Sequence, residues 1–216
     1  YMMARLGYTF NDRYIFNATI RRDGFSGFGE NNKFAIFPSM AIGWRLSEEK
    51  FIKDKVKWLD NLKVRISYGE SGNRTGGRYK TLSTVKSGNG YIYGNNSPEL
   101  LMYLGNMPNL DLKWESTKSL NVGLDFSMLK GRLSGNIEAY WSNTNNLLYD
   151  VSIPEINGAS SVTTNIGKIK NKGVEFSLTG VPVRSKKFDW TATISFSLNK
   201  NKVVSITGLD ANGDGI

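Results

Sequence analysis

Residues 120–141 read LNVGLDFSMLKGRLSGNIEAYW, two runs of alternating apolar and polar side chains on either side of a Leu-Lys-Gly turn. The apolar positions of the two runs are Leu120, Val122, Leu124, Phe126, Leu133, Ile137, Ala139 and Trp141. The positions between them are mostly Ser, Asn, Gly, Asp and Glu. Since successive side chains of a β-strand point to opposite faces, this period of two predicts two antiparallel strands joined by a short turn.

The same period of two recurs in six further segments of the 216 residues. They are residues 2–10, 14–20, 40–46, 62–68, 174–178 and 190–198. Eight strands result, and because each is connected directly to the next, all are predicted to be antiparallel. No apolar run reaches the roughly 18 to 20 residues of a membrane helix, whereas a strand of a membrane barrel needs only about ten alternating residues. The predicted fold is therefore all-β.

The connections between the predicted strands alternate in length. The short ones are residues 11–13, 129–131 and 181–187, with residues 47–60 long enough for a helical turn. The long ones are residues 23–33, 70–118 and 143–171. Short turns at one rim and long loops at the other are typical of bacterial outer-membrane barrels. A soluble half-buried sheet would also have one apolar face, so the loop lengths are what favour a membrane barrel.

The composition argues against catalysis and against nucleic-acid binding. The chain has no Cys and no His, which excludes thiolate nucleophiles, imidazole bases and most transition-metal sites. Its net charge of +9 comes from basic residues spread along the chain, with no recognition motif. Gly24, Gly27 and Gly29 precede an alternating run that contains Pro38, rather than a helix with Gly-Lys-Ser/Thr. We therefore predict a hairpin loop here and not a phosphate site.

Several blocks of the sequence resemble a known family. They are FNATIRRDGFSGFGENNKFAIFPSMAIGWRLSEEKF (16–51), WLDNLKVRISYGESGN (58–73), NMPNLDLKWE with the strand pair that follows it (106–154), and SSVTTNIGKIKNKGVEFSLTG (160–180). In this order they resemble the barrel of SusC/RagA-type TonB-dependent outer-membrane transporters of the Bacteroidota. The resemblance covers most of the chain.

The resemblance implies a larger parent, a barrel of about 22 strands with a plug in its lumen. Residues 1–216 would then be a partial barrel domain, an internal segment without the plug domain, the TonB-contacting box or the C-terminal closing strands. The implied activity is import of oligosaccharides or peptides across the outer membrane of a Gram-negative bacterium. The implied partners are outer-membrane lipid, a SusD-like surface lipoprotein and, through the plug region, TonB.

Three groups of side chains are candidates for function within this frame. Contacts to ligand or lid are expected from the longest loop, at Tyr91, Tyr93, Tyr103 and Trp114. The alternative is that these aromatic residues pack the loop against itself. Membrane-interface aromatic residues are predicted at Tyr8, Phe10, Tyr14, Trp44, Trp141 and Trp190. Lumen-facing Arg21, Arg45 and Arg65 are expected to form salt bridges of a polar wall.

The stretch DANGDGI, residues 210–216, places oxygen ligands as a calcium loop does. Asp210, Asn212 and Asp214 fall on positions one, three and five, and Gly215 on position six. The twelfth position would be residue 221, so a Ca²⁺ site would be complete only in the parent. A turn without an ion is the alternative. No other cofactor is expected.

Two other classes of protein stay open at this point. One is a small eight-stranded barrel with a structural or adhesive role, since eight strands can close around their own side chains. The other is a soluble carbohydrate-binding β-domain. For an internal segment of a larger barrel, two unpaired edges predict aggregation when the 216 residues are produced alone.

Overall fold

The computed structural model describes residues 1–74, 77, 80–93, 97–159 and 161–206. Within them lie the strands β1 (Met2–Phe10), β2 (Tyr14–Gly24), β3 (Phe34–Arg45), β4 (Leu59–Asn73), β5 (Thr84–Tyr93), β6 (Ser97–Asn106), β7 (Glu115–Met128), β8 (Leu133–Ser152), β9 (Ser161–Arg184) and β10 (Asp189–Ser205). The connections contain the helical turns η1 (Glu30–Asn32), η2 (Leu46–Glu48), α1 (Lys50–Lys53) and η3 (Glu155–Asn157). In the described part of the chain, none of the helices has the length and apolar character needed to cross a membrane.

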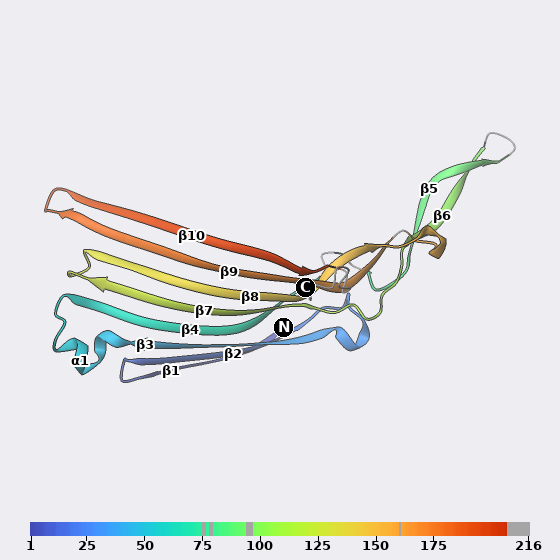
Figure 1. Ribbon diagram of the computed structural model, residues 1–216. Coiled ribbons are helices and arrows are strands. Elements are labelled where there is room, and N and C mark those ends of the chain that lie inside the picture. Colours follow the sequence, from blue (N-terminus) through green and yellow to red (C-terminus); the bar gives the residue numbers. More distant parts are fainter. Residues whose placement is uncertain (75–76, 78–79, 94–96, 160, 207–216) are drawn as a thin grey trace.

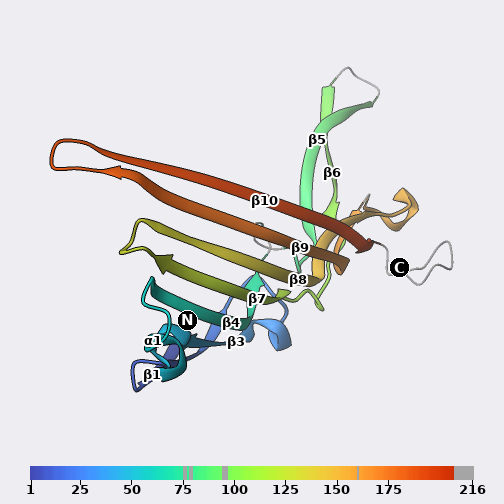
Figure 2. The same cartoon turned by 60° about the vertical axis from the view of Figure 1, so that its left-hand side comes forward.

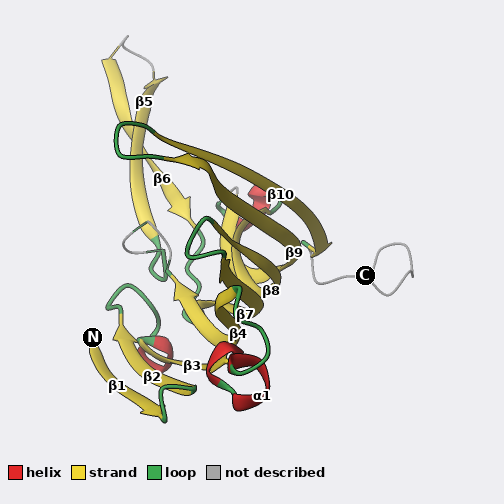
Figure 3. Ribbon diagram, turned by 90° about the vertical axis from the view of Figure 1, so that its left-hand side faces the viewer, coloured by secondary structure: helices red, strands yellow, loops and turns green. Residues whose placement is uncertain are grey.

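Eight of the strands form one antiparallel sheet in the order β1-β2-β3-β4-β7-β8-β9-β10 (Figure 1). The prediction of eight antiparallel strands in one sheet is confirmed, although the chain forms the separate β5–β6 hairpin between β4 and β7. Strands β1 and β10 are the two edges, so the described strands form an open sheet rather than a closed eight-stranded barrel. Seen nearly along the strands, the sheet is bent into an arc (Figure 3). Such an arc is the shape expected of part of a barrel wall.

The turn between β1 and β2 illustrates how the sequence sets the strand pairing. Phe10 pairs with Tyr14, and the backbone N–H of Arg13 donates to the carbonyl of Phe10 at 3.0 Å. Between them Asn11 and Asp12 have φ angles of 48° and 54°. Asn and Asp tolerate this left-handed conformation, which a type I′ turn requires at both central positions. The pairing that follows keeps most apolar side chains of the hairpin on one face, with Met3 and Ile15 on the other.

All the short connections lie at one end of the sheet and the long ones at the other (Figure 1). We call these ends the short-turn rim and the long-loop rim. The long-loop rim carries residues 25–33, the described part of residues 74–114, and residues 153–159. The predicted alternation of connection lengths is thus present in the structure.

The predicted extent of two long loops was wrong. Most of residues 143–171 extends β8 and β9, whose pairing continues to Ser152 and Ser161. The predicted loop 70–118 contains the β5–β6 hairpin, which projects away from the main sheet (Figure 2). Both segments extend past the apolar part of the sheet at the long-loop rim and lack a continuous apolar face. Alternation of apolar and polar residues therefore does not reveal them as strands.

The two faces of the main sheet have opposite character, and we call them the apolar face and the polar face. On the apolar face, Leu6, Ile42 and Ile194 are 62%, 55% and 66% exposed. On the polar face, hydroxyl groups pair across neighbouring strands, at 2.8 Å between Thr117 and Thr144 and at 3.0 Å between Thr179 and Thr193. A sheet with its large aliphatic side chains exposed along its whole width is suited to lipid rather than water.

The buried apolar side chains lie elsewhere, at the long-loop rim. In the described residues they are Phe28, Phe37, Leu112 and Ala159. The only compact core in this part of the chain is therefore formed by the rim loops and the adjoining strand ends.

Candidate functional site

The core of the long-loop rim is a cluster of aromatic rings in edge-to-face contact. Phe28 lies 5.4 Å from Trp114 and 5.1 Å from Phe25, and Phe37 lies 5.7 Å from Trp114, measured between ring centroids. The interplanar angles of 66° to 82° are those at which ring edges meet ring faces favourably. The cluster thus joins the loop after β2 to the start of β3 and to the segment that leads into β7.

Phe37 reaches this cluster because the neighbouring strand has a glycine beside it. Phe37 is on the polar face of β3, in line with Ser39 and Ala41. A Cβ atom added to Gly72 of β4 would overlap the Phe37 ring. Gly72 therefore leaves room for the Phe37 ring to reach over β4 and contact Trp114.

The glycine-rich loop itself is held by two other segments of the chain. Thr81 donates its hydroxyl hydrogen to the carbonyl of Gly27 at 3.3 Å, and the Asn32 side chain donates to the carbonyl of Asp111 at 3.2 Å. A Cβ atom added to Gly29 would overlap the carbonyl oxygen of Leu110. Gly29 is thus a close-approach glycine, which permits two loop backbones to pack together.

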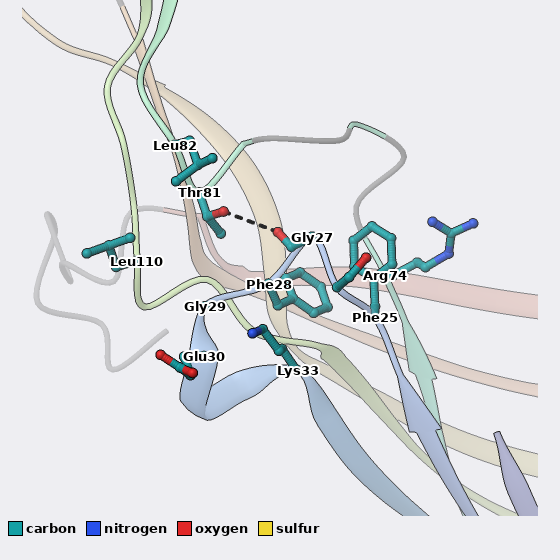
Figure 4. Close-up of a pocket in the computed structure, with 11 residues that line it drawn as sticks. Phe25, Gly27, Phe28, Gly29, Glu30, Lys33, Arg74, Thr81, Leu82 and Leu110 are labelled. Carbon is teal, nitrogen blue, oxygen red and sulfur yellow. Dashed lines mark hydrogen bonds between the residues drawn. The ribbon is translucent and has the colours of Figure 1, made fainter.

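A pocket of about 640 Å³ opens where these three segments meet (Figure 4). Its wall combines aromatic, aliphatic and charged groups: Phe25, Phe28, Lys33, Arg74, Leu82 and Leu110. The Arg74 guanidinium lies 4.6 Å from the centroid of the Phe25 ring, a cation–π distance. Glu30 and Lys33 add one charge of each sign to the pocket. Such a wall suits a ligand or protein segment with both flat apolar and ionic groups.

The four predicted ligand-contact residues do not lie together. Trp114 is half-buried in the aromatic cluster, and its indole N–H is buried without an acceptor in the described part of the chain. Tyr103 is 47% exposed on β6 of the projecting hairpin. Tyr91 and Tyr93 belong to β5 of the same hairpin. The contact role of all four stays a prediction.

Phe25 and Arg74, which line the pocket together, were missed by sequence reasoning. The spacing Gly24-x-x-Gly27-x-Gly29 predicts only a permissive hairpin loop. Phe25 and Phe28, the two phenylalanines between these glycines, were the available signal, since large aromatic side chains in a loop are stabilised by packing against other groups. Arg74 lies 49 positions farther along the chain, counted from Phe25, and no local pattern connects the two.

A second aromatic group lies at the short-turn rim. Phe10, Tyr14 and Trp44 form a cross-strand row, with centroid separations of 6.5 Å and 6.2 Å. Glu49 accepts hydrogen bonds at one carboxylate oxygen from the Tyr14 hydroxyl at 2.8 Å and from the Trp44 indole at 3.1 Å. Its other oxygen lies 3.4 Å from Arg13. The hydrogen bond from Tyr14, reinforced by the one from Trp44, lowers the pKa of Glu49.

The other predicted interface aromatic residues lie at both ends of the apolar face. Tyr8 is exposed on β1, and Trp190 is 53% exposed at the start of β10. Trp141 is different, because it lies in β8 opposite Leu120 and Lys172, on the long-loop side of the apolar face. An interface role for each of these residues stays a prediction.

The polar face carries an ionic network in its middle. Arg65 of β4 binds Asp125 of β7 at 3.1 Å and also Glu138 of β8, while Lys63 lies 3.7 Å from Asp125. Arg65 spans the intervening strand because residue 123 is a glycine, where an added Cβ would lie 2.8 Å from the guanidinium carbon. Arg65 thus forms the expected wall of salt bridges.

The other two arginines expected in the lumen make smaller contacts. Arg21 bridges Asp23 at 2.7 Å, and Arg45 donates to the carbonyl of Asp12 at 3.5 Å. The proposed calcium ligands Asp210, Asn212 and Asp214 lie outside the described residues.

Comparison with known proteins gives a consistent result over nearly the whole chain. Residues 1–215 match the family model described as TonB dependent receptor-like, beta-barrel. A TonB-dependent receptor of Formosa agariphila is 39% identical over 206 residues, which cover 95% of this chain and 20% of the relative. TonB-dependent receptor SusC of Bacteroides thetaiotaomicron is 37% identical over 217 residues, covering 95% and 21%. The chain thus spans about a fifth of the length of the curated relatives it matches.

Solved structures show the same relationship in three dimensions. The RagAB peptide transporter superposes with a TM-score of 0.84 at 31% identity, covering 96% of this chain and 22% of that chain. The RagAB peptide importer in its closed-closed state superposes with a TM-score of 0.83 at 29% sequence identity, and the match covers 94% of this chain and 22% of that chain. The siderophore receptor PirA from Pseudomonas aeruginosa shares the fold, with a TM-score of 0.59 at 14% sequence identity. The match covers 93% of this chain and 34% of the PirA chain. The resemblance to SusC/RagA-type proteins is therefore confirmed, and the chain belongs to the TonB-dependent receptor β-barrel family.

Proposed function

We propose that this chain is part of the barrel wall of a TonB-dependent importer of the SusC/RagA type, located in the outer membrane of a Gram-negative bacterium. The observation that carries the proposal is the single sheet with an exposed apolar face and a hydrogen-bonded polar face. Lipid would contact the first face, and the plug and the lumen would contact the second. The activity proposed is transport, without bond chemistry in the barrel wall.

The long-loop rim is the part of the chain that we propose to contact the cargo or a lid. Aromatic faces such as Phe25 and Tyr103 suit stacking on sugar rings or packing against a protein partner. The charged groups of Glu30, Lys33 and Arg74 suit the ionised ends and side chains of a peptide. The cargo is accordingly an oligosaccharide or a peptide, and the similar RagAB structures, which are named as a peptide importer, support the peptide.

The remaining parts of the machine belong to the rest of the protein and to its partners. A domain that fills the lumen and couples to TonB would supply the energy, since the outer membrane holds no ATP. A SusD-like lipoprotein would close over the long-loop rim. Together with the eight strands described here, further strands would complete a barrel of about 22.

The experiment that tests the function is deletion of the full-length gene, followed by complementation and uptake of labelled peptides and oligosaccharides. We expect the deletion to abolish uptake of one of the two classes and the wild-type gene to restore it. The pair Phe25→Ala and Arg74→Ala should restore it only partly. The pair Phe188→Ala and Arg132→Ala, two exposed positions at the short-turn rim, is the matched control and should restore it fully. Unchanged uptake of both classes in the deletion strain would overturn the proposal.

A further inference from the structure

The apolar face ends abruptly at a group of lysines on β7, β9 and β10. Two successive rows of paired residues are wholly apolar, namely Leu124-Ile137-Phe176-Phe196 and Val122-Ala139-Val174-Leu198. The next row toward the long-loop rim is Leu120-Trp141-Lys172-Lys200, and the one beyond it is Lys118-Asn143-Lys170-Lys202. We call these five lysines the lysine patch.

The lysine patch lies on the same face as the apolar rows. Lys118 precedes Leu120 by two positions on β7, and Lys172 precedes Val174 by two on β9, so their side chains share the apolar face. All five lysines are exposed. A shallow hollow of about 360 Å³ is lined by Trp141, Asn143 and four of the lysines, Lys170, Lys172, Lys200 and Lys202.

The patch is electrostatically unbalanced. Lys172 pairs directly with Lys200, and Lys170 pairs directly with Lys202. Like charges directly opposite each other on one face of a sheet are destabilising. Within the part of the chain that the structure describes, none of the five lysines forms an ion pair. The nearby carboxylates Glu138 and Glu175 occupy the polar face, whereas Glu70 of β4 pairs opposite Lys118 and accepts a hydrogen bond from the Ser116 hydroxyl. The four lysines of β9 and β10 therefore lack a counter-charge among the described residues, and Glu70 offsets at most the charge of Lys118.

We infer that the lysine patch binds the phosphate groups of the outer-leaflet glycolipid, lipopolysaccharide, with the acyl chains lying on the apolar rows beside it. A phosphate-bearing lipid offers anionic groups and hydrocarbon next to each other, in the same order as the patch and the apolar rows. Trp141 lies at the boundary between the two, where indole rings are favoured at a membrane interface. Ammonium groups at this depth reach phosphates by extending along the apolar surface.

The inference rests on the outer-membrane location in the proposed function, in which the long-loop rim faces the cell exterior and hence the lipopolysaccharide leaflet. Among the residues that the structure describes, the apolar face has no comparable group of lysines at the short-turn rim. There the boundary is marked by Tyr14 and Trp44, which hydrogen-bond to Glu49. The long-loop side of the apolar face thus carries a group of positive charges and the short-turn side, in its described residues, does not, which matches an outer membrane whose outer leaflet carries the lipopolysaccharide phosphates.

The test is a binding titration of purified, delipidated full-length transporter in detergent with bisphosphorylated lipid A. The variant carries Lys170→Gln, Lys172→Gln, Lys200→Gln and Lys202→Gln. The matched control removes the same charge from the short-turn rim through Lys50→Gln, Lys55→Gln, Lys57→Gln and Lys130→Gln, all exposed positions. We expect the patch variant to bind lipid A at least about tenfold more weakly than wild type, with the control within about twofold. Both variants should keep the heat-modifiable electrophoretic mobility of a folded barrel.

Two further ligands distinguish binding of the phosphorylated lipid from binding of free phosphate. Dephosphorylated lipid A should bind wild type as weakly as lipid A binds the patch variant, and inorganic phosphate in millimolar excess should not compete. Equal binding of lipid A to wild type and patch variant would overturn the inference. So would competition by inorganic phosphate alone, or a loss of lipoprotein binding in the patch variant with lipid binding intact. Because nutrient uptake is not measured here, failure of the lipid titration leaves the importer proposal standing.

Discussion

Single glycines decide where the large side chains of this sheet lie. Gly123 leaves space for the Arg65 guanidinium above β7, and Gly72 leaves space for the Phe37 ring above β4. Gly29 lets the backbone at Leu110 approach the loop after β2. Glycine in a strand weakens it by itself, so its presence at these positions is explained by the neighbour that takes up the space.

Replacing Gly123 by Ala is expected to disrupt the ionic network on the polar face. The added Cβ would lie 2.8 Å from the guanidinium carbon of Arg65, so the guanidinium has to shift, and we expect the shift to weaken its pairing with Glu138 and Asp125. We expect a loss of about 1–2 kcal/mol, as for charged hydrogen bonds left partly unmade. The measurement is the urea midpoint of full-length protein in detergent.

The matched control for Gly123→Ala is Gly180→Ala, a second strand glycine. There the nearest neighbouring atom to an added Cβ, on Leu133, would be 3.9 Å away, an ordinary contact. This variant should unfold at the same urea concentration as wild type or slightly higher. Equal midpoints for the two variants would show that Gly123 does not position Arg65.

The Glu49 carboxylate predicts a pH dependence at the short-turn rim. Its pKa is lowered from the ordinary value of 4.5, first by the hydrogen bond from Tyr14 and then by the one from Trp44. A lowered pKa in the folded state means that this contribution to stability is complete above the unfolded value and is lost as pH falls through the folded value. We therefore expect wild type to exceed Glu49→Gln in unfolding temperature by a constant margin at neutral pH, and this margin to shrink below about pH 4.5.

The difference in unfolding temperature between wild type and Glu49→Gln reports on the Glu49 carboxylate alone, because the other carboxylates titrate in both proteins. Thermal unfolding of both proteins between pH 7 and pH 3 is the measurement. A margin that stays constant down to pH 3, or that grows there, would contradict the assigned role of the Glu49 carboxylate.

At the scale of elements, the chain divides into a barrel wall and an added hairpin. β5 and β6 form their own two-stranded sheet, and their base is closed where Thr84 hydrogen-bonds to the side chain of Asn106. The Asn106 amide also donates to the carbonyl of Leu82 at 3.0 Å. The hairpin begins and ends at the same place on the rim. We therefore expect the wall to fold without it.

Replacing residues 84–106 by a short Gly-Ser linker should leave barrel assembly intact. Heat-modifiable mobility and the amount of protein in the outer membrane are expected to match wild type. Binding of the cargo or the lipoprotein should weaken by roughly tenfold, as when one interface anchor is removed. Misassembled protein would show that the hairpin contributes to the wall, and unchanged binding would remove it from the proposed contact surface.

At the scale of the whole molecule, the described strands form an arc with two open edges. β1 and β10 each have one neighbour in the sheet, and the apolar face has no protein cover in the described residues. Unpaired edges and exposed aliphatic side chains promote association between copies. We therefore expect the wall to be stable only as part of a closed barrel in lipid.

We therefore expect residues 1–216, produced alone and refolded in detergent, to aggregate. Size-exclusion chromatography should give material in the void volume, and the band in semi-native electrophoresis should not shift on heating. The full-length protein treated identically is the control. A monomeric, cooperatively unfolding β-protein from the 216 residues would show that the arc closes on itself.

The amino-acid sequence by itself determined the eight wall strands, their antiparallel order and the sorting of short and long connections. These features are local, because alternation and turn chemistry act over a few neighbouring residues. Only the tertiary structure decided which side chains meet at the long-loop end of the sheet. The pocket joins Phe25 to Arg74 and Leu110, and the lysine patch joins Lys118 to Lys170 and Lys202. The members of each group lie far apart in the sequence and become neighbours only when the chain folds. The pairing register of the strands and the space left by individual glycines decide which of these side chains meet.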